Sequence, residues 1–118
     1  GSNDVLSGSA EVIVCCPQDA RRLWPEVPYI TGPGRAVTTL VTTKAIFRKT
    51  TPDGSFLLEA VIPSVTESNR PVETLVQEIR ESTGWEIGTS SSMAVLSPPD
   101  SNLVRLLRIF DPDCYYLK

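Results

Sequence analysis

The most constraining feature of this chain is a pair of β-rich runs joined by a strong turn signal. The first run, Ala36–Lys49, is dominated by Val, Thr, Ile and Phe, which favour pleated backbone. It is too long for one average strand, so we expect a bend or bulge near Thr42–Lys44. Thr51–Gly54 reads Thr-Pro-Asp-Gly, a typical turn sequence, and Ser55–Ile62 supplies an apolar return strand. The pattern predicts a β-hairpin.

Two amphipathic helices are expected after the hairpin. In each, apolar residues recur at i, i+3, i+4 and i+7, the spacing of one helical face. These residues are Val72, Leu75, Val76 and Ile79 in the first helix, and Leu103, Leu106, Leu107 and Phe110 in the second. Pro71 suits the first turn and Gly84 the C-cap of the first helix. Asp100 or Ser101 can cap the second helix, which Asp111-Pro112 ends.

The remaining segments carry weaker signals. Glu11–Cys16 contains three consecutive β-branched residues and predicts a strand covered on both faces. Gln18–Trp24 is expected to form one or two helical turns, with Leu23 and Trp24 packed inward. We also expect a loop at Gly1–Ser9, short strands at Tyr29–Thr31 and Trp85–Ile87, a flexible linker at Gly88–Ser92, and a packed tail at Cys114–Leu117.

Length and charge limit the classes of protein. The 118 residues are enough for one modest domain. The net charge of −3 and the lack of a basic run argue against nucleic-acid binding. No apolar run approaches the roughly 18 residues of a membrane span, and the first residues lack a signal-peptide pattern. A reduced, cytoplasmic setting is expected from the three cysteines, an odd count without the spacing of a disulfide framework.

The side chains available for chemistry are restricted, because the chain has no histidine. This removes the usual general base, the Ser-His and Cys-His pairs, and most zinc sites. Of the three cysteines, Cys15 and Cys16 are adjacent, and neighbouring strand residues point to opposite faces. We interpret this pair as small apolar residues ending a strand in a reducing compartment, and we predict no metal site.

Four features allow both a functional and a purely structural interpretation. The Gly32-Pro33-Gly34-Arg35 segment can present backbone N–H groups and a guanidinium to an anion, or form a sharp turn in which glycine takes a positive φ. Glu59 can act as an acid, base or nucleophile, or be a solvated strand residue. Lys44 can meet a phosphate or carbonyl, or be a solvated strand end. Tyr115 and Tyr116 can line a pocket or anchor the tail. For Arg35, Glu59 and Lys44 spacing alone favours the structural interpretation.

Taken in order, six motifs resemble the C-terminal half of the β subunit of family I coenzyme A-transferases, of the glutaconate and 3-oxoacid type. Gly1–Val5 resembles the end of a Gly-Gly-x-x-Asp segment, and Val72–Gly84 resembles a signature helix. The other four are Glu11–Asp19, Ile30–Gly32, Thr42–Phe47 and Leu106–Pro112. Each motif is short, but their common order is fairly specific. Residues 1–118 would then be a single domain or a fragment of that subunit.

The resemblance implies an α/β fold: part of an open, mostly parallel sheet flanked by helices, CoA-transferase-like (NagB/RpiA-like). It implies a CoA thioester as substrate without another cofactor, a partner α subunit, and a hetero-oligomer. The family's nucleophilic glutamate lies in the N-terminal part of the β subunit, and no glutamate here matches its motif, so no catalytic residue is assigned. The residues expected to face the substrate are Gly1, Asn3, Asp4, Gly32, Pro33 and Gly34.

Two alternatives to CoA transfer between an acyl-CoA and a carboxylic acid stay open. A decarboxylase branch that acts on glutaconyl-CoA shares the family's fold. A non-catalytic binding or scaffold domain could also have kept the fold. For the transferase-like subunit, the apolar strands predict that this chain pairs with strands outside it, and that it exposes apolar surface when isolated.

Overall fold

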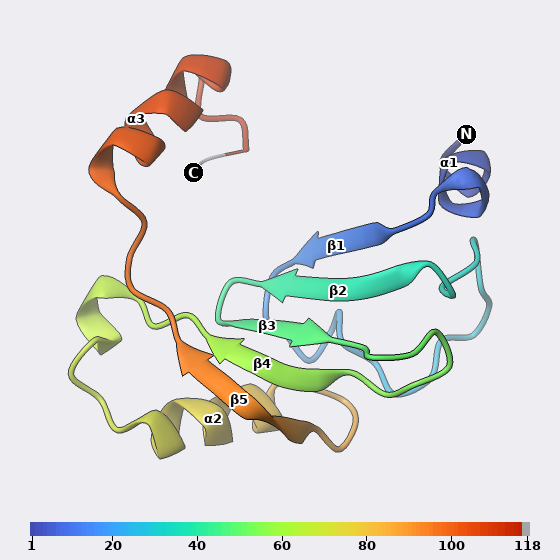
Figure 1. The fold of residues 1–118 in the computed structure, drawn as a ribbon, viewed down its shortest axis with the longest axis horizontal. Coiled ribbons are helices and arrows are strands. Elements are labelled where there is room, and N and C mark those ends of the chain that lie inside the picture. Colours follow the sequence, from blue (N-terminus) through green and yellow to red (C-terminus); the bar gives the residue numbers. More distant parts are fainter. Residues whose placement is uncertain (117–118) are drawn as a thin grey trace.

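The computed structural model describes residues 1–116. Their elements are α1 (Ser2–Gly8), β1 (Val12–Cys16), β2 (Val37–Thr42), β3 (Ala45–Arg48), β4 (Leu57–Val61), a 3-10 turn η1 (Val65–Glu67), α2 (Val72–Glu81), β5 (Gly88–Val95) and α3 (Ser101–Phe110). The five strands form one open sheet in sequence order, β1-β2-β3-β4-β5 (Figure 1). The predicted α/β fold, an open sheet with flanking helices, is confirmed.

Strand pairing makes this part of the sheet mixed. β1–β2 and β4–β5 are parallel, whereas β2–β3 and β3–β4 are antiparallel. The antiparallel pairs arise because tight turns at Thr43-Lys44 and Thr51–Gly54 reverse the chain, while parallel pairs need long connections. The bend expected within Ala36–Lys49 is confirmed and is a complete hairpin turn. Thr42 Oγ1 supports it by accepting a hydrogen bond from the Ala45 N–H at 2.9 Å.

The hydrophobic core lies between the sheet and α2. Phe47, Leu58 and Val61 from the strands and Ile79 from α2 are its largest fully buried side chains. Leu75 and Leu23 are also buried in it, which confirms the predicted docking of α2 and the inward position of Leu23. Each such side chain contributes about 1.5–3 kcal/mol when fully removed from water. This core fixes the β2–β3–β4 meander relative to α2.

The first thirty residues differ from expectation in three places. Ser2–Gly8 is a helix instead of a loop, and tertiary contact explains it, because Leu6 packs against Gly32. Residues 18–24 form a single turn, in which the Leu23 N–H donates a hydrogen bond to the Asp19 carbonyl at 3.0 Å. Trp24 is exposed, contrary to the expected inward packing. The short strand expected at Tyr29–Thr31 does not form, because no strand lies beside it to pair with.

The segment after α2 also differs. The expected linker Gly88–Ser92 is the first part of β5, and the expected strand Trp85–Ile87 is not a strand. Backbone pairing with β4 organises this polar segment, as Leu57 pairs with Gly88 and Leu58 with Thr89. α3 forms as predicted, with Asp100 as its N-cap: the Asp100 carboxylate accepts a hydrogen bond from the Asn102 N–H at 2.7 Å.

Large apolar surfaces stay open at both ends of the molecule. β1 is an edge strand with Ile13 and Val14 exposed, so the prediction that both its faces are covered is wrong for this chain. α3 lies away from the sheet and contributes no buried residue (Figure 1). In the tail, Cys114, Tyr115 and Tyr116 are exposed, contrary to the expected packing, and Leu117 lies outside the described residues. Within residues 1–116, no helix has the length and apolar character needed to cross a bilayer.

Candidate substrate-facing site

The first helix and the Thr31–Ala36 loop lie against one another. Asn3 Nδ2 donates a hydrogen bond to the Thr31 carbonyl at 3.2 Å. Gly32 lies so close to the helix that a Cβ added there would be 2.6 Å from Leu6 Cδ1. A glycine at position 32 therefore permits this close approach, and two segments nearly thirty residues apart form one wall.

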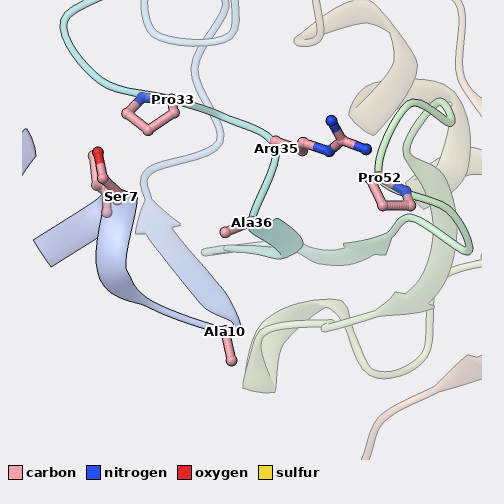
Figure 2. A pocket seen from close by; sticks show the side chains of 7 residues that line it. Ser7, Ala10, Pro33, Arg35, Ala36 and Pro52 are labelled. Atoms are coloured by element: carbon pink, nitrogen blue, oxygen red, sulfur yellow. The ribbon is translucent and has the colours of Figure 1, made fainter.

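Beside this contact is a hollow of about 510 Å³. Leu6 lines it together with Ser7, Ala10, Pro33, Arg35, Ala36 and Pro52 (Figure 2). Most of these side chains are apolar, and the polar groups are the Ser7 hydroxyl and the Arg35 guanidinium. In Figure 2 the Arg35 side chain extends from the loop toward Pro52. A ligand with an apolar body and an anionic group would match this lining.

The loop turns later than its sequence suggests. The Val37 N–H donates to the Gly34 carbonyl at 3.1 Å, which places the turn at Arg35-Ala36 and after Gly32-Pro33-Gly34. All seven glycines lie among the described residues, and none has a positive φ. The expectation that a positive φ explains this glycine pair is wrong. Gly32 is explained by the contact with Leu6, and an added Cβ at Gly34 meets nothing within 4 Å.

The residues expected to face the substrate are partly gathered at this place. Pro33 lines the hollow, while Asn3 and Gly32 hold its wall together. Gly1 and Asp4 are exposed and contact one another, with the Gly1 amine 2.6 Å from Asp4 Oδ2. Gly34 is exposed at the edge of the loop. The contributions of Leu6, Ser7, Ala10, Ala36 and Pro52 were not predicted, because no local pattern shows that the three segments meet.

Lys44 has a structural role that the sequence did not indicate. Its ammonium lies 3.3 Å from Glu67 Oε1 and 3.3 Å from Glu78 Oε2, and Arg70 pairs with both carboxylates. The prediction of a solvated Lys44 is therefore incomplete, because its side chain is 38% exposed but paired with two carboxylates. Hydrogen bonds from Ser64, with Lys44 beside it, lower the pKa of Glu67 to about 2. Arg70 and then Lys44 lower the pKa of Glu78.

Other candidate side chains are engaged in structure. Glu59 accepts a hydrogen bond from Arg48 Nε at 2.6 Å on the sheet surface, which agrees with the structural interpretation. Burial raises the pKa of the Cys16 thiol, which makes it a weaker nucleophile. Gln18 Nε2 donates to Thr83 Oγ1 at 2.8 Å and joins the end of β1 to the end of α2. No cluster of three or more metal-ligating side chains occurs in residues 1–116.

Comparison with solved structures identifies proteins of the same fold. The whole chain superposes on 48% of a chain of glutaconate coenzyme A-transferase from Acidaminococcus fermentans, with a TM-score of 0.74 and 19% identity. The decarboxylase AibA/AibB matches 93% of this chain and 45% of its own, with a TM-score of 0.62 and 28% identity. A variant of that decarboxylase is 30% identical over 89% of this chain and 40% of its own, with a TM-score of 0.61.

This chain therefore has the coenzyme A-transferase fold, and it spans less than half the length of each of these structures. No protein-family model matches its sequence, and no curated protein sequence matches it significantly.

Proposed function

We propose that this chain is the C-terminal part of a β-type subunit of an enzyme that transfers coenzyme A between an acyl-CoA and a carboxylic acid. The observation that carries the proposal is the superposition of the entire chain on one half of a glutaconate coenzyme A-transferase chain. The six ordered sequence motifs, which resemble the C-terminal half of a β subunit, support it independently.

In this proposal, the substrate-facing part of the chain is the region around the hollow. Its apolar wall suits the acyl or pantetheine part of a CoA thioester, and Arg35 suits an anionic group of the same ligand. The segment containing Gly1, Asn3 and Asp4 and the loop Gly32-Pro33-Gly34 hold or border that wall. The nucleophilic glutamate belongs to a segment outside these residues, and no cofactor besides the thioester substrate is required.

The proposed assembly follows from the surfaces that stay open. β1 presents an unpaired edge with exposed Ile13 and Val14, which suits addition of a strand from the other part of the subunit. The apolar face of α3 suits contact with a second chain. We propose a hetero-oligomer with an α-type subunit, located in the cytoplasm.

The test uses the full-length protein, with the chains that copurify with it, incubated with glutaconyl-CoA and acetate. We expect acetyl-CoA to form, and borohydride reduction to leave an adduct on a glutamate outside this chain. Arg35→Ala should raise KM for the thioester about tenfold, because it removes one charge-assisted hydrogen bond to the ligand. Arg22→Ala, which removes another exposed arginine that does not line the hollow, should leave KM unchanged.

Decarboxylation is the second candidate, because sequence identity to AibA/AibB reaches 28–30% while that to the transferase is 19%. Release of CO₂ from carboxyl-labelled glutaconyl-CoA without any acceptor acid would establish the decarboxylase and contradict CoA transfer. Binding of acyl-CoA without either reaction would indicate a non-catalytic binding domain. An adduct on a residue of this chain would contradict our assignment of the nucleophile to another segment.

A further inference from the structure

We propose that Lys49 is a positioning residue that holds the two rims of the hollow together and so sets the hollow's width for its ligand. One rim is the loop that carries Pro33, Arg35 and Ala36, and the other is the turn that carries Pro52. The identity of the ligand rests on the proposed function. The contacts of Lys49 with the two rims, called the clamp below, do not depend on it.

The Lys49 ammonium bridges the rims directly. Lys49 Nζ donates to the Gly34 carbonyl at 3.4 Å and to the Pro52 carbonyl at 3.1 Å. Gly34 lies between Pro33 and Arg35 in the sequence, and both of these residues line the hollow. Pro52 lines the hollow itself. The two rims approach from different strand connections, so a single cation joins segments that the sheet ladder does not connect at this point.

Lys49 is itself held in place. Its backbone N–H donates to the Thr38 carbonyl at 2.9 Å, one step beyond the end of β3. Its ammonium lies 5.1 Å from the centre of the Phe56 ring, and Phe56 packs against the hydrophobic core. A cation over an aromatic face is attracted by the ring quadrupole. The backbone of Lys49 is thus held against β2, while its ammonium lies over Phe56 and contacts both rims.

The partners of Lys49 distinguish it from Lys44. Lys44 is neutralised by two carboxylates, whereas Lys49 forms no ion pair within residues 1–116. Backbone carbonyls satisfy the donors of an ammonium without cancelling its charge. Lys49 therefore fixes the rims and keeps a positive charge beside Arg35, which favours an anionic group on the bound ligand.

Amide hydrogen exchange in the unliganded protein tests the clamp. Lys49→Met keeps a long unbranched side chain and removes the donors, so exchange at the Val37 and Gly54 amides should rise together by about tenfold. These amides close the two rim turns on Gly34 and Thr51. Lys49→Arg should restore most of the protection. Lys44→Met, the matched loss of a lysine at the other end of β3, should leave both amides unchanged.

Steady-state kinetics test the consequence for the ligand. We expect Lys49→Met to raise KM for the acyl-CoA by about tenfold and to change kcat less than twofold, because positioning acts on binding. Unchanged exchange at Val37 and Gly54 in Lys49→Met would overturn the clamp, as would an equal rise in Lys44→Met. If the parent protein binds no acyl-CoA, the proposed function fails while the exchange comparison still decides the clamp.

Discussion

Gly84 lies where the backbone leading from β1 meets the end of α2. Its N–H donates to the Leu23 carbonyl at 2.8 Å. A Cβ added at Gly84 would clash with that carbonyl oxygen and would lie 2.6 Å from Pro25 Cδ. The residue is glycine because two backbones touch there. α2 ends at Glu81 with Ser82 as its C-cap, so the C-cap role expected of Gly84 is wrong.

Substitution of Gly84 should therefore destabilise the fold. We expect Gly84→Ala to lower the free energy of unfolding by about 1–3 kcal/mol, the usual cost of forcing extra atoms into a packed site. Gly8→Ala is the matched control, since an added Cβ there meets nothing within 4 Å. Urea denaturation measures both variants, and equal midpoints would contradict the steric account of Gly84.

At the scale of elements, charged side chains join three parts of the chain. Lys44 follows β2, Glu67 ends η1, and Glu78 lies on α2, with Arg70 completing the network. Isolated surface ion pairs contribute little, but here each carboxylate contacts two cations. The network therefore fixes the loop before α2 against the β2–β3 turn.

Acid should weaken this connection. The pKa of Glu67 is about 2 in the folded protein, below its ordinary value of 4.5, and that of Glu78 is also lowered. Groups with a lowered folded pKa stabilise the fold above their unfolded pKa and lose this effect as pH falls. Stability should thus decrease from about pH 4.5 toward about pH 2.

Unfolding measured across that pH range tests the contribution of Glu67. Glu67→Gln should flatten the acid-side slope, because the amide cannot gain or lose the proton. Glu73→Gln, on an exposed α2 residue that forms no ion pair within residues 1–116, should keep the parental slope. A parental slope in Glu67→Gln would contradict the assignment.

For the whole molecule, apolar side chains stay exposed on two elements, α3 and β1. Leu103, Leu106, Leu107 and Phe110 form one stripe on α3, and all are exposed. The exposed Ile13 and Val14 of β1 lie on the edge of the sheet. Contiguous exposed apolar surface of this kind marks interaction sites in soluble proteins.

The isolated chain should self-associate through α3. We expect the Leu106→Glu, Phe110→Glu double variant to raise the monomer fraction measured by sedimentation velocity, with the helix retained through its Asp100 cap. The control double variant Arg105→Glu, Arg108→Glu also introduces two glutamates, but on the sides of α3 away from the apolar stripe. It should therefore raise the monomer fraction less. A parent chain that is monomeric at every concentration would contradict the prediction.

Features with a local cause could be predicted from the sequence. The Thr51–Gly54 turn, the β3–β4 hairpin, and the helices α2 and α3 depend on turn residues and on periodic apolar positions within a single segment. The ordered motifs resembling coenzyme A-transferases agree with the fold of the structural neighbours. The candidate loop was also found from its residues, although its turn was placed too early.

Other features depend on partners distant in sequence, and only the tertiary structure decided them. β5 is polar and is held by pairing with β4, while α1 is stabilised where Leu6 meets Gly32. The hollow forms because α1, the Thr31–Ala36 loop and the Pro52 turn converge, and Lys49 joins two of these segments. Amino-acid types set local conformation, but the contacts that create a site arise between segments whose proximity no local pattern encodes.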